Sequence, residues 1–149
     1  AILATDMANH FTKLGALKSA LSSEGFDATE EKNKMQCCEW MFHLADISNP
    51  AKPFAVCRQW TDLLFVEFFD QGDHEKEKGF TVSMFMDRVT TNIAKSQLGF
   101  IDFVQKPSWD AGVMMVPAIK PFRDALDANR AEWEKLEEEY LPEADNPKP

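Results

Sequence analysis

The 149-residue chain has few of the residues that build a self-contained metal or disulfide site. Its three histidines lie at positions 10, 43 and 74, and no two of them are three or four residues apart, as a zinc-binding helix requires. Of its three cysteines, Cys37 and Cys38 are neighbours in a helical pattern that points their side chains apart. The sequence therefore indicates no disulfide framework and predicts a reducing, cytoplasmic location.

Long uncharged apolar runs are also missing. No segment approaches the ~18 apolar residues that cross a bilayer, and no signal-peptide pattern opens the chain. Sixteen basic residues against 25 acidic residues give a formal net charge of −9, which repels phosphate backbones and anionic membrane surfaces. We therefore expect no nucleic-acid partner and no membrane contact from this segment, and the sequence indicates no particular oligomeric state.

Three further patterns are absent: a Gly-rich phosphate loop, a Gly-x-Ser-x-Gly nucleophile elbow and the alternation typical of strands. What the chain does have is apolar material, with 44% hydrophobic residues that include twelve Phe and four Trp. This is enough for a packed core in one domain. Because the apolar residues recur at helical spacing, the sequence predicts a compact, all-α, multi-helix domain.

Apolar residues three and four positions apart predict five helices, each ended by Gly, Asn-Pro or Pro. We expect them over residues 3–21, from after Thr29 to Asn49, over about 53–69, over about 87–105, and from about 117 to Pro142. The second carries one apolar stripe of Met35, Cys38, Phe42 and Ala45, and the third is apolar so far round that we expect contacts on two sides, one of them a pocket.

The stretches between and beyond these helices are polar. Residues 72–79, charged and bounded by glycines, are predicted to be an exposed link in which Asp73 caps a short turn. We place the domain in residues 1–141 and expect the acidic, proline-rich residues 142–149 to be a disordered tail. The helical pattern is already running at Ala1, so we expect further sequence upstream.

Asp46 is the first unusual residue, because it lies among apolar neighbours at the end of a predicted buried helix. An unpaired buried carboxylate is costly, so it takes up a proton, binds a base or metal, or caps backbone amides. His43, three residues earlier on the same face, is placed to share or orient that site. Capping of the next helix is the simpler alternative for Asp46, and one Asp is a weak signal for a metal.

Gln97 is the second unusual residue, because Ile93, Phe100, Ile101 and Val104 share its helical stripe. Left unpaired in such a place, a primary amide costs ~1–3 kcal/mol. The simpler interpretation is a core amide satisfied by nearby backbone. The functional one is that the amide, a donor and an acceptor in one plane, reads the edge of a nucleobase while the ring of Phe100, one turn later, stacks on it.

Five segments together resemble the catalytic domain of class I cyclic-nucleotide phosphodiesterases. They are LATDM (3–7) with His10, HLADISNP (43–50), RQWTD (58–62), EFFDQGD (67–73) and KSQLGFID (95–102), in the family's order and spacing. The resemblance covers about residues 1–140, roughly the C-terminal half of the family's all-helical, HD-type catalytic domain. It implies hydrolysis of cyclic AMP or cyclic GMP to the 5′-monophosphate with two divalent metals, zinc and magnesium or manganese.

The resemblance also implies a role for each matched residue. Asp46 becomes a metal ligand beside the substrate, with Thr5 and His43 behind the metal site. Gln97 becomes the purine-reading amide, Phe100 and Leu64 the two sides of a hydrophobic clamp, and Phe68 part of the same pocket. Asn49 helps to read the base and favours cyclic AMP over cyclic GMP.

The family's His-containing motifs, which supply the general acid and most metal ligands, are absent from these 149 residues. We therefore expect no catalytic residue within the chain, incomplete metal binding, and no turnover by the chain alone. Two alternatives remain: a degenerate nucleotide-binding or scaffolding module without catalysis, and a plain helical interaction protein in which Asp46 and Gln97 are satisfied core groups.

Overall fold

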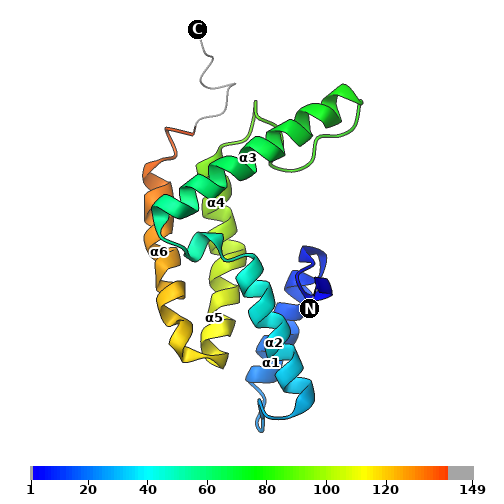
Figure 1. The fold of residues 1–149 in the computed structure, drawn as a ribbon, viewed down its shortest axis with the longest axis vertical. Helices are drawn as coiled ribbons and strands as arrows, with labels where there is room; N and C mark the ends of the chain where they lie inside the picture. Colours follow the sequence, from blue (N-terminus) through cyan, green and yellow to red (C-terminus); the bar gives the residue numbers. More distant parts are fainter. Residues whose placement is uncertain (1, 141–149) are drawn as a thin grey trace.

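The computed structural model describes residues 2–140, and within them the chain is entirely helical, as predicted (Figure 1). Its α-helices are α1 (His10–Leu21), α2 (Glu31–Asp46), α3 (Phe54–Glu77), α4 (Ile93–Phe100), α5 (Lys106–Met115) and α6 (Lys120–Lys135). Short 3-10 turns are η1 (Ile2–Ala4), η2 (Met7–Asn9), η3 (Asn49–Ala51) and η5 (Pro117–Ile119), and η4 (Ile101–Gln105) is π-helical.

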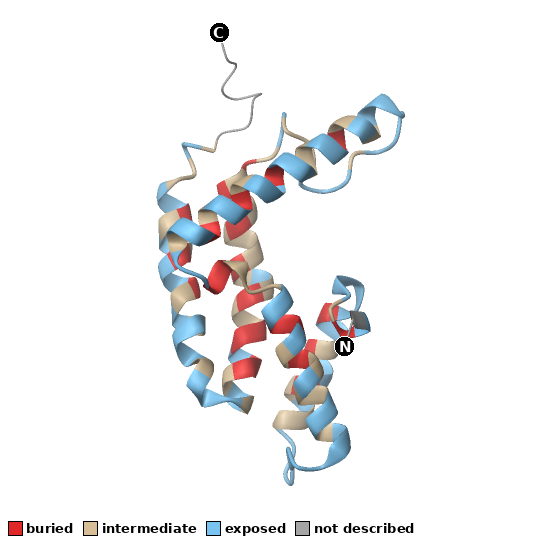
Figure 2. Cartoon of the chain, viewed as in Figure 1, coloured by how far each residue is buried: buried red, intermediate tan, exposed pale blue. Residues whose placement is uncertain are grey.

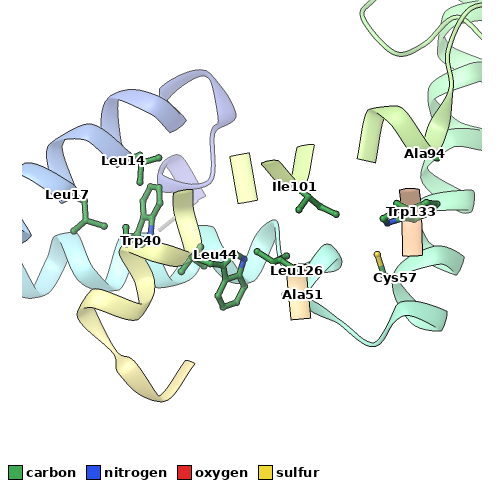
Figure 3. Close-up of a cluster of buried hydrophobic side chains, with 12 residues drawn as sticks. Leu14, Leu17, Trp40, Leu44, Ala51, Cys57, Ala94, Ile101, Leu126 and Trp133 are labelled. Carbon is green, nitrogen blue, oxygen red and sulfur yellow. The ribbon is translucent and has the colours of Figure 1, made fainter. Parts of the chain in front are cut away.

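The helices form three groups (Figure 1). α4, η4 and α5 follow one another as a long rod, and α6 returns alongside that rod. α1 and α2 both pack against α5, and α3 crosses near the α4 end of the rod before extending away from the body. One cluster of buried side chains connects the groups (Figure 3); among its members are Leu14, Leu17, Trp40, Leu44, Ala51, Cys57, Ala94, Ile101, Leu126 and Trp133.

The predicted stop at Pro107 is wrong, because the rod continues through it to Met115. Proline has no N–H to give the carbonyl four residues earlier, and its ring crowds that carbonyl. The π-helical segment accommodates this: Lys106 N–H bonds the carbonyl of Ile101, five residues back, so the backbone widens just before the proline.

The predicted link over residues 72–79 is also wrong for most of its length. α3 runs through Gly72 to Glu77, and only Lys78 and Gly79 lie beyond it. Gly72 is buried because the loop that follows α3 returns onto it: a Cβ at Gly72 would lie 1.8 Å from the carbonyl oxygen of Met86. This glycine therefore marks a close backbone approach rather than a helix end.

The first helix begins later than predicted. Residues 3–9 form the turns η1 and η2, and α1 starts at His10. Asp6 causes this break, since its carboxylate accepts a hydrogen bond from the N–H of Ala8 at 2.9 Å and caps η2. The turn brings Met7 and the buried His10 towards the end of α2.

Much of the apolar surface of α2 and α3 is exposed (Figure 2). The stripe of Met35, Cys38, Phe42 and Ala45 on α2 faces solvent in the described structure, and the buried side of that helix carries Trp40, His43 and Leu44 instead. On α3, Phe65 is buried while Trp60 and Leu63 are exposed. The contacts expected on two sides of α3 are therefore present on one side only among the described residues.

Two further expectations concern membrane-spanning helices and the C-terminal tail. None of the helices in residues 2–140 combines the length and apolarity needed to cross a bilayer. The predicted tail, residues 142–149, lies outside the described residues, so the domain boundary at residue 141 stays a prediction.

Candidate functional site

A cavity of about 510 Å³ lies where the end of α2, the middle of α3 and the end of α4 meet. Six residues that the sequence singled out line it together: Asp46, Asn49, Leu64, Phe68, Gln97 and Phe100. A more open groove of about 650 Å³ between α1 and α2 is lined by small and polar side chains and by none of these six. The cavity at α3 and α4 is therefore the candidate site.

The amide of Asn49, in the turn η3, has a fixed orientation. Its Nδ2 lies 3.2 Å from the backbone carbonyl oxygen of Cys57 and 3.3 Å from the hydroxyl of Thr61. A carbonyl oxygen can only accept, so the nitrogen must be the end that faces α3. The Oδ1 of Asn49 is then left buried, without a hydrogen-bond partner among the described residues, as an acceptor at the cavity.

Gln97 reaches the cavity from α4. It is 7% exposed, and the described residues give its side-chain amide no hydrogen bond. Asn92 fixes the start of this helix, since its Oδ1 caps the N–H of Lys95 at 2.9 Å and its Nδ2 donates to the carbonyl of Glu137 at 2.9 Å. An unpaired amide on a firmly capped helix is a group that a ligand can use.

The apolar walls come from two helices. Leu64 and Phe68 lie one turn apart on α3, and Phe100 lies at the C-terminal end of α4, one turn after Gln97. The ring of Phe68 packs edge-on against the buried Phe65, with ring centroids 5.5 Å apart, which supports that wall from behind. A flat aromatic ligand between these walls has an amide at its edge.

Asp46 is the last residue of α2 and lines the cavity. The expectation that its carboxylate is buried is wrong for the described structure, in which Asp46 is exposed. Among residues 2–140 no three His, Cys, Asp or Glu side chains come together as a metal site. The described residues therefore do not fit a complete divalent-metal centre, and Asp46 supplies a single carboxylate at the cavity.

His43 bonds to another histidine rather than to Asp46. Its Nε2 lies 2.7 Å from Nδ1 of His10, and Nε2 of His10 lies 3.3 Å from the hydroxyl of Ser108, which donates to the carbonyl of Val104. Ser108 must then accept from His10, and the neutral pair leaves Nδ1 of His43 as a buried acceptor with no partner among the described residues.

Burial of the two rings is the main reason why the pKa of His10 and the pKa of His43 both lie below the usual histidine value. Electrostatic repulsion from His43 lowers the pKa of His10 further. The carboxylate of Asp46 acts in the opposite direction on His43. Thr5 is half-buried and lies between η1 and η2, shortly before His10 in the chain.

Eight of the fourteen cavity residues were not among the six that the sequence singled out, and Thr61, Phe85 and Ile47 are three of these eight. Thr61 orients Asn49 and lies in the RQWTD segment (58–62) that carries part of the family resemblance, although no role was predicted for it. Phe85 reaches the cavity from the loop after α3 with φ of 68°, which is strained for a bulky residue and has no sequence signal. Ile47 lines the cavity between Asp46 and Asn49.

Comparison with known proteins identifies a family for this chain. The family model of the 3′,5′-cyclic nucleotide phosphodiesterases matches residues 1–126. The chain is 37% identical over 139 residues to 3′,5′-cyclic-AMP phosphodiesterase 4C of Rattus norvegicus, covering 89% of this chain and 26% of that protein. It is 34% identical over 142 residues to 3′,5′-cyclic-AMP phosphodiesterase, isoform F, of Drosophila melanogaster, covering 91% of this chain and 22% of that protein.

Solved structures match the fold of this chain as well. LmjPDEB1 in complex with IBMX matches with a TM-score of 0.85 and 34% identity, over 93% of this chain and 42% of that one. The phosphodiesterase domain of Salpingoeca rosetta rhodopsin phosphodiesterase matches with a TM-score of 0.81 and 32% identity, over 93% and 43%. The chain thus spans about a quarter of the curated relatives and less than half of the solved ones. On sequence and fold together, this chain belongs to the 3′,5′-cyclic nucleotide phosphodiesterase family.

Proposed function

We propose that this chain supplies the purine-binding part of an enzyme that hydrolyses cyclic AMP to 5′-AMP. The observation that carries the proposal is the meeting of Asn49, Gln97 and Phe100 at one cavity that Leu64 and Phe68 also line. The solved relative that holds IBMX and the curated relatives named for cyclic AMP support it.

Phe100 and the α3 side chains Leu64 and Phe68 form the clamp for the base. A purine is flat and mostly apolar on its faces, so it lies between these walls with its polar edge turned to the amides. Stacking on an aromatic side chain contributes ~1–3 kcal/mol per base in other nucleic-acid sites. In this proposal the clamp supplies affinity and the amides supply selectivity.

The two amides have different tasks. Gln97 carries both a donor and an acceptor and makes no hydrogen bond to the described residues, so it can turn to suit either purine. Asn49 cannot turn, because Cys57 and Thr61 hold its nitrogen. Its Oδ1 accepts from the 6-amino group of adenine but opposes the 6-oxo group of guanine, which is also an acceptor. This favours cyclic AMP over cyclic GMP.

Asp46 is proposed as one ligand of a metal site that residues outside the described chain complete. The described residues form no group of three donors, so we derive no chemical step through a metal here. In this proposal zinc, and magnesium or manganese, bind only when the other ligands are present, with Thr5 and His43 behind the site. A general-acid histidine also comes from elsewhere, so the chain alone does not turn over substrate.

The test uses the complete protein that contains this chain, alongside the 149-residue chain. With zinc, magnesium and cyclic AMP, we expect the complete protein to release 5′-AMP and the chain to release none. Gln97→Ala should lower kcat/KM of the complete protein about tenfold or more, as expected for a lost base-reading hydrogen bond. Lys95→Ala, an exposed position two residues earlier on α4, is the matched control.

Each outcome separates the candidates. Binding of cyclic AMP by the complete protein without its hydrolysis would favour the degenerate binding module. A complete protein that neither binds nor hydrolyses cyclic nucleotides contradicts the proposal. Metal-dependent turnover by the chain alone would contradict the placement of the general acid outside it.

A further inference from the structure

Gln105 is a fully buried amide that the site described above does not use. It is the last residue of the π-helical segment η4 and has no exposed surface. Its Nε2 donates to the backbone carbonyl of Ile47 at 2.8 Å, and its Oε1 accepts from the indole N–H of Trp109 at 3.0 Å. Both ends of the amide are therefore fixed. Its nitrogen must face the carbonyl, which only accepts, and its oxygen must face the indole N–H, which only donates.

The carbonyl that Gln105 binds, that of Ile47, belongs to the segment that connects Asp46 to Asn49. Ile47 follows the last residue of α2, so its peptide group sets the direction in which the chain leaves Asp46 and approaches Asn49. A second buried amide, Asn129 of α6, donates to the carbonyls of Pro50 and Lys52 at 2.7 Å each. Residues 47–52 are thus held at three carbonyls by two buried side chains from other helices.

The rod formed by α4, η4 and α5 positions both base-reading amides, those of Gln97 and Asn49. Gln97 lies on α4, and η4 continues α4 without a break to Gln105. The first part of the rod, α4, therefore carries Gln97 directly, and its middle part, at Gln105, holds the turn that carries Asn49. The π-helical widening sets where Gln105 points, because it adds a residue to that turn of the rod.

We propose that Gln105 is a positioning residue for purine selectivity: by holding the carbonyl of Ile47, it sets where the Oδ1 of Asn49 lies relative to the amide of Gln97. The proposal rests on the proposed function. A hydrogen bond weakens steeply with distance and angle, so a small shift of residues 47–49 reduces discrimination between 6-amino and 6-oxo purines without removing the clamp. Asn129 supports the far side of the same turn.

The kinetic test compares three variants of the complete protein. Gln105→Met keeps the length of the side chain and removes its donor and acceptor. Trp109→Phe leaves the donor to Ile47 intact, removes the indole N–H and replaces the indole by a smaller ring. Ser108→Ala, at another fully buried hydrogen-bonding side chain on the same rod, makes no contact with residues 47–52 that the structure shows and is the matched control.

We expect Gln105→Met to lower the ratio of kcat/KM for cyclic AMP to that for cyclic GMP about tenfold, mainly through a higher KM for cyclic AMP. Trp109→Phe and Ser108→Ala should leave this ratio within about twofold of the wild type, although each lowers Tm. A purely structural role for Gln105 predicts instead that all three variants lower Tm and leave the ratio unchanged, and that result would overturn the proposal.

A second readout does not depend on catalysis. In the complete protein labelled with 15N-asparagine, the side-chain amide resonance of Asn49, assigned from Asn49→Asp, should move in Gln105→Met and stay in place in Ser108→Ala. If the wild type hydrolyses neither cyclic nucleotide, the proposed function fails, and this resonance alone decides the positioning role: an unmoved signal overturns it. Should Gln105→Met not fold, Gln105→Leu takes its place in both measurements.

Discussion

The side-chain nitrogen of Asn49 lies 3.2 Å from the carbonyl oxygen of Cys57, and this contact decides which end of Asn49 faces the cavity. Gln97, across the same cavity, has no such contact among the described residues. One amide is therefore held by the protein and the other is free to follow the ligand. In the proposed function, selectivity among purines then depends on the held amide and on the residues that hold it.

Asn49→Asp should remove the preference for cyclic AMP. A carboxylate cannot donate to Cys57 or Thr61, and its oxygen is repelled by the carbonyl that now orients Asn49. We expect kcat/KM for cyclic AMP in the complete protein to fall at least tenfold, with a smaller change for cyclic GMP. Asn33→Asp on α2, away from the cavity, should change neither value. Equal losses for both nucleotides in Asn49→Asp would contradict the role of Oδ1.

The sequence predicted the all-helical fold, and it singled out six of the residues that line the cavity. Gln97 and Phe100 were singled out because a polar amide stood on an apolar helical stripe, and the structure does place both at one cavity. Helical periodicity is a local signal, so a spacing of three residues is enough to put two side chains on one face. The shared cavity with α3 followed only from the resemblance to a family.

The errors have tertiary causes. Pro107 normally ends a helix, but a π-helical turn accommodates it, and no local pattern reveals that turn. Gly72 normally marks a link, but here it makes room for the returning backbone at Met86. The role of Gln105 has no local sequence signal, because its partner, Ile47, is 58 residues away in the chain. Contacts of this range cannot be read from spacing.

Asp46→Asn should reduce metal binding by the complete protein. An amide oxygen is a weaker ligand for a divalent cation than a carboxylate, and the described residues offer no substitute donor group. We expect less zinc per protein after dialysis, measured by atomic emission, and loss of hydrolysis. Asp124→Asn, an exposed carboxylate paired with Lys120 on α6, should retain the wild-type metal content. Unchanged zinc in Asp46→Asn would show that Asp46 is not a ligand.

Gly72→Ala should destabilise the protein through the loop that follows α3. The new methyl group would lie 1.8 Å from the carbonyl oxygen of Met86, so backbone must move, and that movement displaces Phe85 at the cavity. Overpacking of this kind costs ~1–3 kcal/mol, which corresponds to a Tm lower by roughly 5 °C.

The matched control is Gly15→Ala in α1, where an added Cβ meets no atom within 4 Å. Alanine is favoured over glycine in a helix by about 1 kcal/mol, so this variant should have an unchanged or higher Tm. Differential scanning calorimetry of the two variants measures both effects. Equal stability of Gly72→Ala and the wild type would mean that the loop does not rest on α3 in solution.

Tyr140 ties the segment after α6 to α3. Its hydroxyl donates to Asp62 at 2.6 Å and accepts from Nε of Arg58 at 3.1 Å, and Arg58 also pairs with Glu139. Burial, and then the hydrogen bond to the Asp62 carboxylate, raise the pKa of Tyr140 to about 12. The Arg58 guanidinium opposes this shift without cancelling it.

Tyr140 is the only tyrosine among the 149 residues, so absorbance at 295 nm during an alkaline titration of the chain reports it alone. We expect a midpoint near 12 in the folded chain, against about 10 in denaturant. The neutral phenol is the form that folding favours. Its contribution to stability is therefore complete below pH ~10 and is lost as the pH rises towards that of the folded group. Asp62→Asn removes the negative acceptor and should lower the midpoint, whereas a wild-type midpoint near that of free tyrosine would show that this tie to α3 does not form.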